Sequence, residues 1–107
     1  MKPLIRRQQA DLDVQEAIDY YLTHAPDQAL LFVDALEQSY RHIQRSPGTG
    51  SLRYAHDLNL PGVRFRICKK FPYLVFYIEK SDQIEIWRVL HGKRDIPAWM
   101  TNTDDAL

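Results

Sequence analysis

Three stretches in the second half of the chain decide the fold: VRFRIC (residues 63–68), YLVFYI (73–78) and IEIWRVLH (84–91). The first alternates apolar and polar residues, which is the period of a strand with one buried face. The second is apolar at both parities, as expected for a strand in the middle of a sheet. Turn-like segments separate the three, so they predict consecutive antiparallel strands.

The third stretch also alternates, which predicts that its side chains divide between two faces of the sheet. One face is expected to carry Ile84, Ile86, Arg88 and Leu90, and the other Glu85, Trp87, Val89 and His91.

Helical spacing precedes the strands. One apolar stripe is formed by Val14, Ala17, Ile18, Tyr21, Leu22 and Ala25. A second runs through Ala29, Phe32, Val33, Leu36, Tyr40 and Ile43. Pro26 suits the first turn of the second helix, which is expected to end by about Arg45, before the loop composition of residues 46–51. With almost no linker, the two helices are expected to form an antiparallel hairpin.

A short strand over Pro3–Arg7 completes the expected order, β-α-α-β-β-β. The prediction is an α+β fold in which the helical hairpin packs on one face of a mostly antiparallel sheet. At 107 residues, the chain is expected to form a single domain over residues 1–100, followed by a polar C-terminal tail at 101–107.

The net charge of zero hides blocks of opposite sign. Residues 63–94 contain eight lysines and arginines but only three acidic residues, whereas the segments on either side are net acidic. No apolar run reaches the length of a membrane span, the N-terminus shows no signal-peptide core, and the lone Cys68 fits a reducing compartment. We therefore expect a cytoplasmic protein with no membrane association.

Metal and cofactor chemistry find little support in the sequence. The four histidines, His24, His42, His56 and His91, have no metal-ligand spacing on one helix, and there is no cysteine pair. We expect no cofactor and no metal. Cys68 is interpreted as a small, buried apolar residue of a strand.

The concentrated polar feature is basic. Arg64 and Arg66 leave one face of a strand, Arg88 and His91 close the last strand, and Lys93 and Arg94 follow at once. These groups could converge on a cationic, phosphate-binding surface. The alternative is that the alternating arginines form the solvated face of a sheet.

From Val63 to Ile67, Phe71 to Tyr77 and Ile84 to Ile96, the chain resembles the ParE branch of the RelE/ParE toxin superfamily. The resemblance covers about residues 4–100, including the Tyr-bearing first helix and the proline-initiated second helix. Its most specific parts are the aromatic strand and the C-terminal segment Arg88-Val89-Leu90-His91-Gly92-Lys93-Arg94-Asp95.

This resemblance implies the toxin of a type II toxin–antitoxin module, silenced by a cognate ParD-like antitoxin in a hetero-oligomer and associated with plasmid stabilisation. Two activities occur on this fold. RelE-like members cut messenger RNA on the ribosome, and ParE-like members poison DNA gyrase without being nucleases. A degenerate, non-toxic member that only binds antitoxin is a further alternative.

The residues favour the gyrase branch. Arg64, Arg66 and Arg94 match basic positions of the RelE-like nucleases, and His91 could serve as an acid or base. However, the third strand begins with Tyr73-Leu74 where those nucleases have an arginine, and residues 96–100 contain no tyrosine. We therefore expect no catalytic residues, and target binding by Arg64, Arg66, Arg88, His91, Lys93, Arg94 and Trp99.

Two further expectations concern apolar residues. More of them occur on the helices than two core stripes need, so part of this surface is predicted to bind an amphipathic antitoxin helix through Tyr20, Tyr21, Leu30, Leu31 and Tyr40. Trp99 follows Pro97, which allows one short helical turn. Trp99 is interpreted either as a cap on the core or as a contact to gyrase.

Overall fold

The computed structural model describes residues 1–100. The predicted tail at residues 101–107 lies outside the described residues. The elements in chain order are β1 (Leu4–Arg6), α1 (Gln8–His24), α2 (Pro26–Arg45), the 3-10 turn η1 (Pro47–Thr49), α3 (Arg53–Asp57), β2 (Arg64–Ile67), β3 (Tyr73–Glu79), β4 (Ile84–His91) and α4 (Ile96–Met100).

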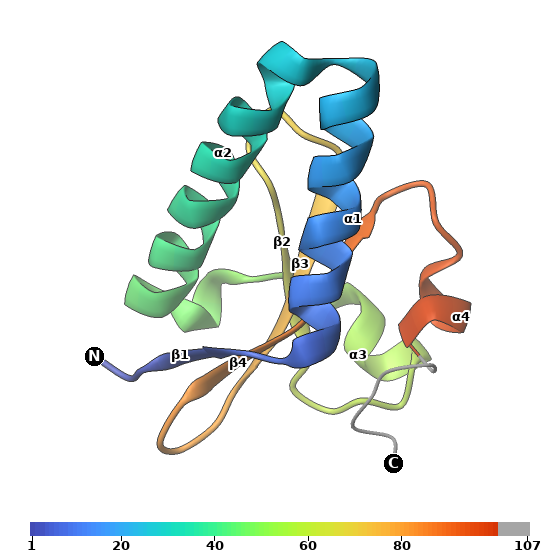
Figure 1. Cartoon of the computed structure of the whole chain (residues 1–107). Coiled ribbons are helices and arrows are strands. Elements are labelled where there is room, and N and C mark those ends of the chain that lie inside the picture. Colours follow the sequence, from blue (N-terminus) through green and yellow to red (C-terminus); the bar gives the residue numbers. More distant parts are fainter. Residues whose placement is uncertain (101–107) are drawn as a thin grey trace.

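The strands form one four-stranded sheet in the order β1-β4-β3-β2. The β2–β3 and β3–β4 pairs are antiparallel, and β1 lies parallel to the first half of β4, with Leu4 opposite Ile84. The helices α1 and α2 run side by side across one face (Figure 1). This arrangement confirms the predicted α+β fold class.

The helical hairpin covers its face of the sheet with a core of aromatic and branched side chains. Phe32 and Ile43 of α2 are fully buried, as are Val75 and Tyr77 of β3. Helix α1 also packs on β4 through Ala10 and Ala17, whose small side chains let the helix lie close to the strand. Within residues 1–100, no helix has the length and apolar composition needed to cross a membrane.

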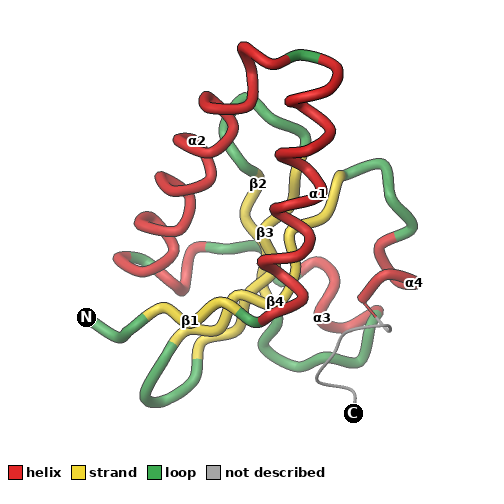
Figure 2. The backbone as a smooth tube through the Cα atoms, in the orientation of Figure 1, coloured by secondary structure: helices red, strands yellow, loops and turns green. Residues whose placement is uncertain are grey.

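The opposite face of the sheet is covered as well, and no pattern in the sequence predicted this second layer. A second core contains Val63, Phe76, Trp87, Leu90, Ile96 and Met100, and residues of α3 pack against it. Side chains of the short helices α3 and α4 both belong to this cluster. Figure 2 shows the backbones of these two helices near each other. Each has only five residues, too few to show a helical period in the sequence.

A bulge in β4 changes which way its side chains point. Phe76 lies opposite Arg88 while the next residue, Tyr77, lies opposite Ile86, so Trp87 is an extra residue in β4. Val89 therefore joins Ile84 and Ile86 under the helices, and Leu90 joins Trp87 in the second core. The prediction that Leu90 shares a face with Ile86 is wrong for this reason.

Candidate functional site

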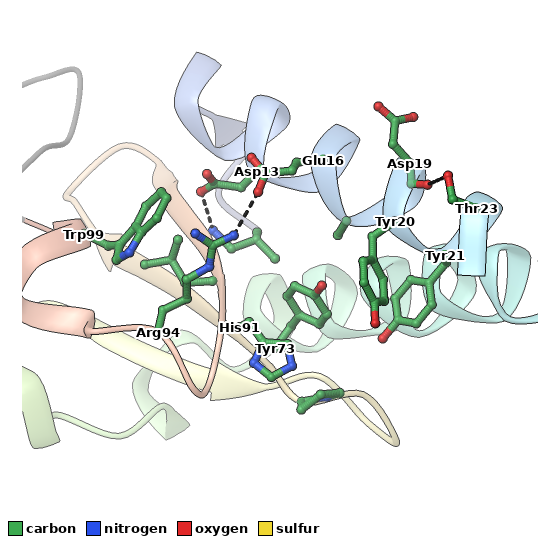
Figure 3. Close-up of a pocket in the computed structure, with 14 residues that line it drawn as sticks. Asp13, Glu16, Asp19, Tyr20, Tyr21, Thr23, Tyr73, His91, Arg94 and Trp99 are labelled. Atoms are coloured by element: carbon green, nitrogen blue, oxygen red, sulfur yellow. Dashed lines mark hydrogen bonds and ion pairs between the residues drawn. The ribbon is translucent and has the colours of Figure 1, made fainter. Parts of the chain in front are cut away.

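A groove of about 760 Å³ lies between α1 and the C-terminal end of β4. Side chains of α1 form one wall, and Tyr73, His91, Arg94 and Trp99 contribute to the other (Figure 3). Buried Ala17 and Val89 also line it. The groove therefore lies where the first helix meets the last strand, and it combines aromatic rings with charged groups.

Arg94 is held in this groove by two neighbours. Its guanidinium carbon lies 4.1 Å from the centroid of the Trp99 ring, and Nη2 donates to Glu16 Oε1 at 2.8 Å. Both members of this ion pair are partly exposed, so the pair itself contributes at most about 1 kcal/mol to stability. Stacking and pairing together orient Arg94 while leaving part of its side chain open to a partner.

His91 is oriented by its own turn. Its Nδ1 accepts the backbone N–H of Lys93 at 3.1 Å, so the proton of the neutral ring lies on Nε2. The ring meets Tyr73 edge-on, with 5.2 Å between centroids. Partial burial and the positive charges of Lys93 and Arg94 lower the pKa of His91, which favours the neutral, hydrogen-bonding form at pH 7.

Arg88 does not join this surface, so its predicted place on a cationic face is wrong. The residue is 1% exposed, and Nε and Nη2 each donate to the Asp13 carboxylate at 2.8 Å. Asp13 also accepts the backbone N–H of Val89 at 3.0 Å. Because β1 pairs only with residues 84–86 of β4, Asp13 of α1 takes the place of a strand partner beyond that point.

Arg64 and Arg66 lie elsewhere. They are on β2, paired with Tyr77 and Val75, and β3 separates this strand from β4. Arg64 Nη1 donates to the carbonyl of Gly50 at 2.8 Å. The expected convergence of these arginines with His91 and Arg94 is therefore wrong. The alternative, a solvated sheet face, is also wrong, because both are half-buried on the face that carries the helical hairpin.

Comparison with known proteins decides the family. Residues 4–96 match the model of a family described as the ParE toxin of the type II toxin–antitoxin system parDE. The chain belongs to this family. The resemblance recognised in the sequence is thereby confirmed.

One solved structure similar to this ParE-family chain is the chromosomal ParDE toxin–antitoxin system from P. aeruginosa. A chain in it is 23% identical and superposes with a TM-score of 0.71, over 85% of this chain and 96% of that one. At this identity the match confirms the fold. No curated protein matches the chain.

The residues predicted to bind an antitoxin fall into two groups in this ParE-family chain. Tyr20, Leu30 and Leu31 are exposed by 55%, 70% and 53%, and they flank the turn between α1 and α2. Tyr21 and Tyr40 instead pack against the core under the hairpin, as the ring contacts of Tyr21 with Phe32 illustrate. Leu30 and Leu31 are available to a partner at the hairpin tip, Tyr20 lines the groove beside α1, and Tyr21 and Tyr40 stabilise the toxin fold.

Sequence reasoning missed Asp13 and Glu16 as site residues. Both were part of an acidic first helix, and nothing in their spacing predicted partners in the C-terminal segment. One signal was present: Asp13 lies on the buried stripe of α1 between Ala10 and Ala17, where a carboxylate needs a partner.

The remaining candidates from the sequence are Cys68 and the possible metal ligands. Cys68 is fully buried, which confirms its interpretation as a small core residue, but it lies just beyond the end of β2 and not in the strand. Burial raises the pKa of its thiol, against the opposing effects of Ser39 and Arg66. In the part of the chain that the structure describes, no three His, Cys, Asp or Glu side chains are grouped closely enough to hold a metal ion.

Proposed function

We propose that this ParE-family toxin poisons DNA gyrase by binding, and that a ParD-like antitoxin neutralises it in a hetero-oligomer. The observation that carries the proposal is the arrangement of its basic groups. His91, Arg94 and Trp99 line one groove, whereas Arg64 and Arg66 lie beyond β3. Cleavage of RNA needs an acid, a base and phosphate-stabilising cations around one phosphorus atom. The separation of these arginines from His91 favours binding over cleavage.

The groove suits recognition of a partner. The stacked pair of Arg94 and Trp99 offers a cation and an aromatic surface together, which are the residue types that dominate interface energies. Lys93 is exposed beside them and adds positive charge. A gyrase target places the toxin in the cytoplasm, together with the enzyme and its DNA.

The gyrase proposal is tested with purified toxin, gyrase and supercoiled plasmid. We expect the wild-type toxin to cause cleaved DNA to accumulate. Trp99→Ala and Arg94→Ala should each weaken this by about 1–3 kcal/mol, or roughly 5- to 150-fold in effective concentration. His91→Ala should retain most of the activity, since no proton transfer is required.

Two results would contradict the proposal. If gyrase is unaffected and messenger RNA is cut on the ribosome, with His91→Ala abolishing the cutting in a folded protein, the nuclease alternative holds. If expression of the wild-type chain reduces neither survival nor gyrase activity while antitoxin still binds, the chain is a non-toxic member.

The antitoxin is proposed to cover the exposed apolar residues at the tip of the helical hairpin. Replacing Leu30 and Leu31 together with Glu should weaken binding of the antitoxin by at least about 2 kcal/mol, because two exposed contacts become charged. The change should leave thermal stability unaltered, since both side chains are outside the core. Titration calorimetry measures the affinity.

Leu52 provides a matched control for this experiment. It is an exposed leucine, by 46%, outside the hairpin. Leu52→Glu should leave the antitoxin affinity unchanged. Equal losses at Leu52 and at the hairpin tip would place the antitoxin elsewhere.

A further inference from the structure

Arg88 connects layers on opposite faces of the sheet. Its Nε and Nη2 bind Asp13 of α1, which covers the first core, and its Nη1 donates to the carbonyl of Trp99 in α4 at 2.8 Å. The side chains of Arg88 and Asp13 are only 2% and 6% exposed. One buried guanidinium thus uses three donors to join the first helix to the C-terminal helix.

Helix α4 needs such an anchor. Its five residues are far fewer than the roughly 12–15 that a helix needs to persist by itself. Ile96 and Met100 hold it on the second core. The carbonyls at its C-terminal end have no partner within the helix, and Arg88 supplies one to Trp99.

Trp99 is therefore fixed at two points. Arg88 donates a hydrogen bond to its backbone carbonyl, and the Arg94 guanidinium stacks on its indole ring at 4.1 Å. The guanidinium of Arg88 also lies 5.6 Å from the ring centroid. The orientation of the ring toward the groove follows from the position of Arg88, which in turn follows from Asp13.

We propose that Asp13 and Arg88 are positioning residues for Trp99, holding α4 in the orientation in which Trp99 meets gyrase. This inference rests on the proposed gyrase function. It means that the surface proposed for gyrase depends on α1, although α1 is distant from α4 in the sequence. It also predicts that lysine cannot replace Arg88. A lysine at position 88 could neutralise Asp13, but a single ammonium cannot reproduce the fork that also reaches Trp99.

The test uses the full-length chain in a Trp87→Phe background, so that Trp99 is the single tryptophan. Arg88→Lys keeps both charges, and the double change Asp13→Leu with Arg88→Met removes both, so neither leaves a buried charge alone. The matched control changes Arg6 to Met and Asp11 to Leu. Arg6 and Asp11 also form an Arg–Asp pair involving α1, at 3.0 Å, but they are half-exposed.

Four measurements separate positioning from folding: thermal unfolding, antitoxin affinity, acrylamide quenching of Trp99 fluorescence, and the cleaved DNA that accumulates with gyrase. In both Arg88 variants we expect quenching to rise at least about twofold as α4 loosens. The toxin concentration for half-maximal cleavage should rise about tenfold, and antitoxin affinity should stay within about twofold. The control should match the parent in all four measurements.

Unchanged Trp99 quenching in the folded Arg88 variants would overturn the inference, and either variant suffices if the other fails to fold. Increased quenching with undiminished gyrase activity would overturn the role in target binding. If the parent protein has no effect on gyrase, the proposed function fails, whereas the quenching comparison still decides whether Asp13 and Arg88 position Trp99.

Discussion

Replacement of Arg88 by Ala is expected to lower the free energy of unfolding by about 3–5 kcal/mol. The carboxylate of Asp13 would remain buried with only the Val89 N–H as a partner, after losing two charge-assisted hydrogen bonds. Asp13→Ala should cost a similar amount, because it leaves the guanidinium of Arg88 buried without a counter-charge.

Urea unfolding followed by circular dichroism measures both losses. The exposed pair Arg6–Asp11 is the reference, and Arg6→Ala should cost no more than about 1 kcal/mol. A loss below about 1 kcal/mol for Arg88→Ala would show that solvent reaches Asp13 in the folded protein.

The second large expected effect is a loss of folding stability at low pH, which arises from Glu85. Burial opposes ionisation of Glu85, but hydrogen bonds from Arg7, Lys80 and Gln83 outweigh it and hold its pKa at about 2, against an ordinary value of 4.5. The unfolded chain therefore binds a proton at Glu85 at a higher pH than the native protein does. The stabilisation is complete above about pH 4.5 and disappears as the pH falls through 2, a loss of about 3 kcal/mol.

Glu85→Gln tests this directly. The variant should be less stable than the parent at neutral pH, and the difference should shrink between pH 4.5 and 2. Glu79→Gln is the control, because Glu79 pairs with Lys2 at a more exposed position. Stability curves for Glu85→Gln and the parent that stay parallel down to pH 2 would contradict the assignment.

The main elements of the fold were predictable because their patterns are long. Helices α1 and α2 show several turns of helical period, and β3 is apolar at both parities. Helix α3 escaped prediction because five residues hold little more than one turn, and α4 was expected only as the short helical turn that Pro97 allows. The bulge in β4 has no local sequence signal either. The extra residue, Trp87, depends on how β3, β4 and α1 pack together.

The site was less predictable than the fold. Chain order alone places Arg94 and His91 at the end of the last strand. The burial of Arg88, however, depends on its ion pair with Asp13, 75 positions away. Charged residues are rarely fully buried, so a surface position was the reasonable expectation for an isolated arginine. Arg64 and Arg66 were misplaced for a related reason: alternation indicates a shared face, but not which face the helices cover.

The pairing of β1 with β4 has a consequence for the order of folding. Pairing of Leu4 with Ile84 closes most of the chain into a loop, and pairings between residues so distant in sequence form slowly. The contacts of α1 with α2 are local and should form first, so pulse-labelled hydrogen exchange should protect hairpin amides before those of β1. Protection of β1 first would contradict this order. During synthesis, the hairpin tip that we propose for the antitoxin would then exist before β4 and α4 complete the surface proposed for gyrase, so a newly made toxin could be captured before it becomes able to poison its target.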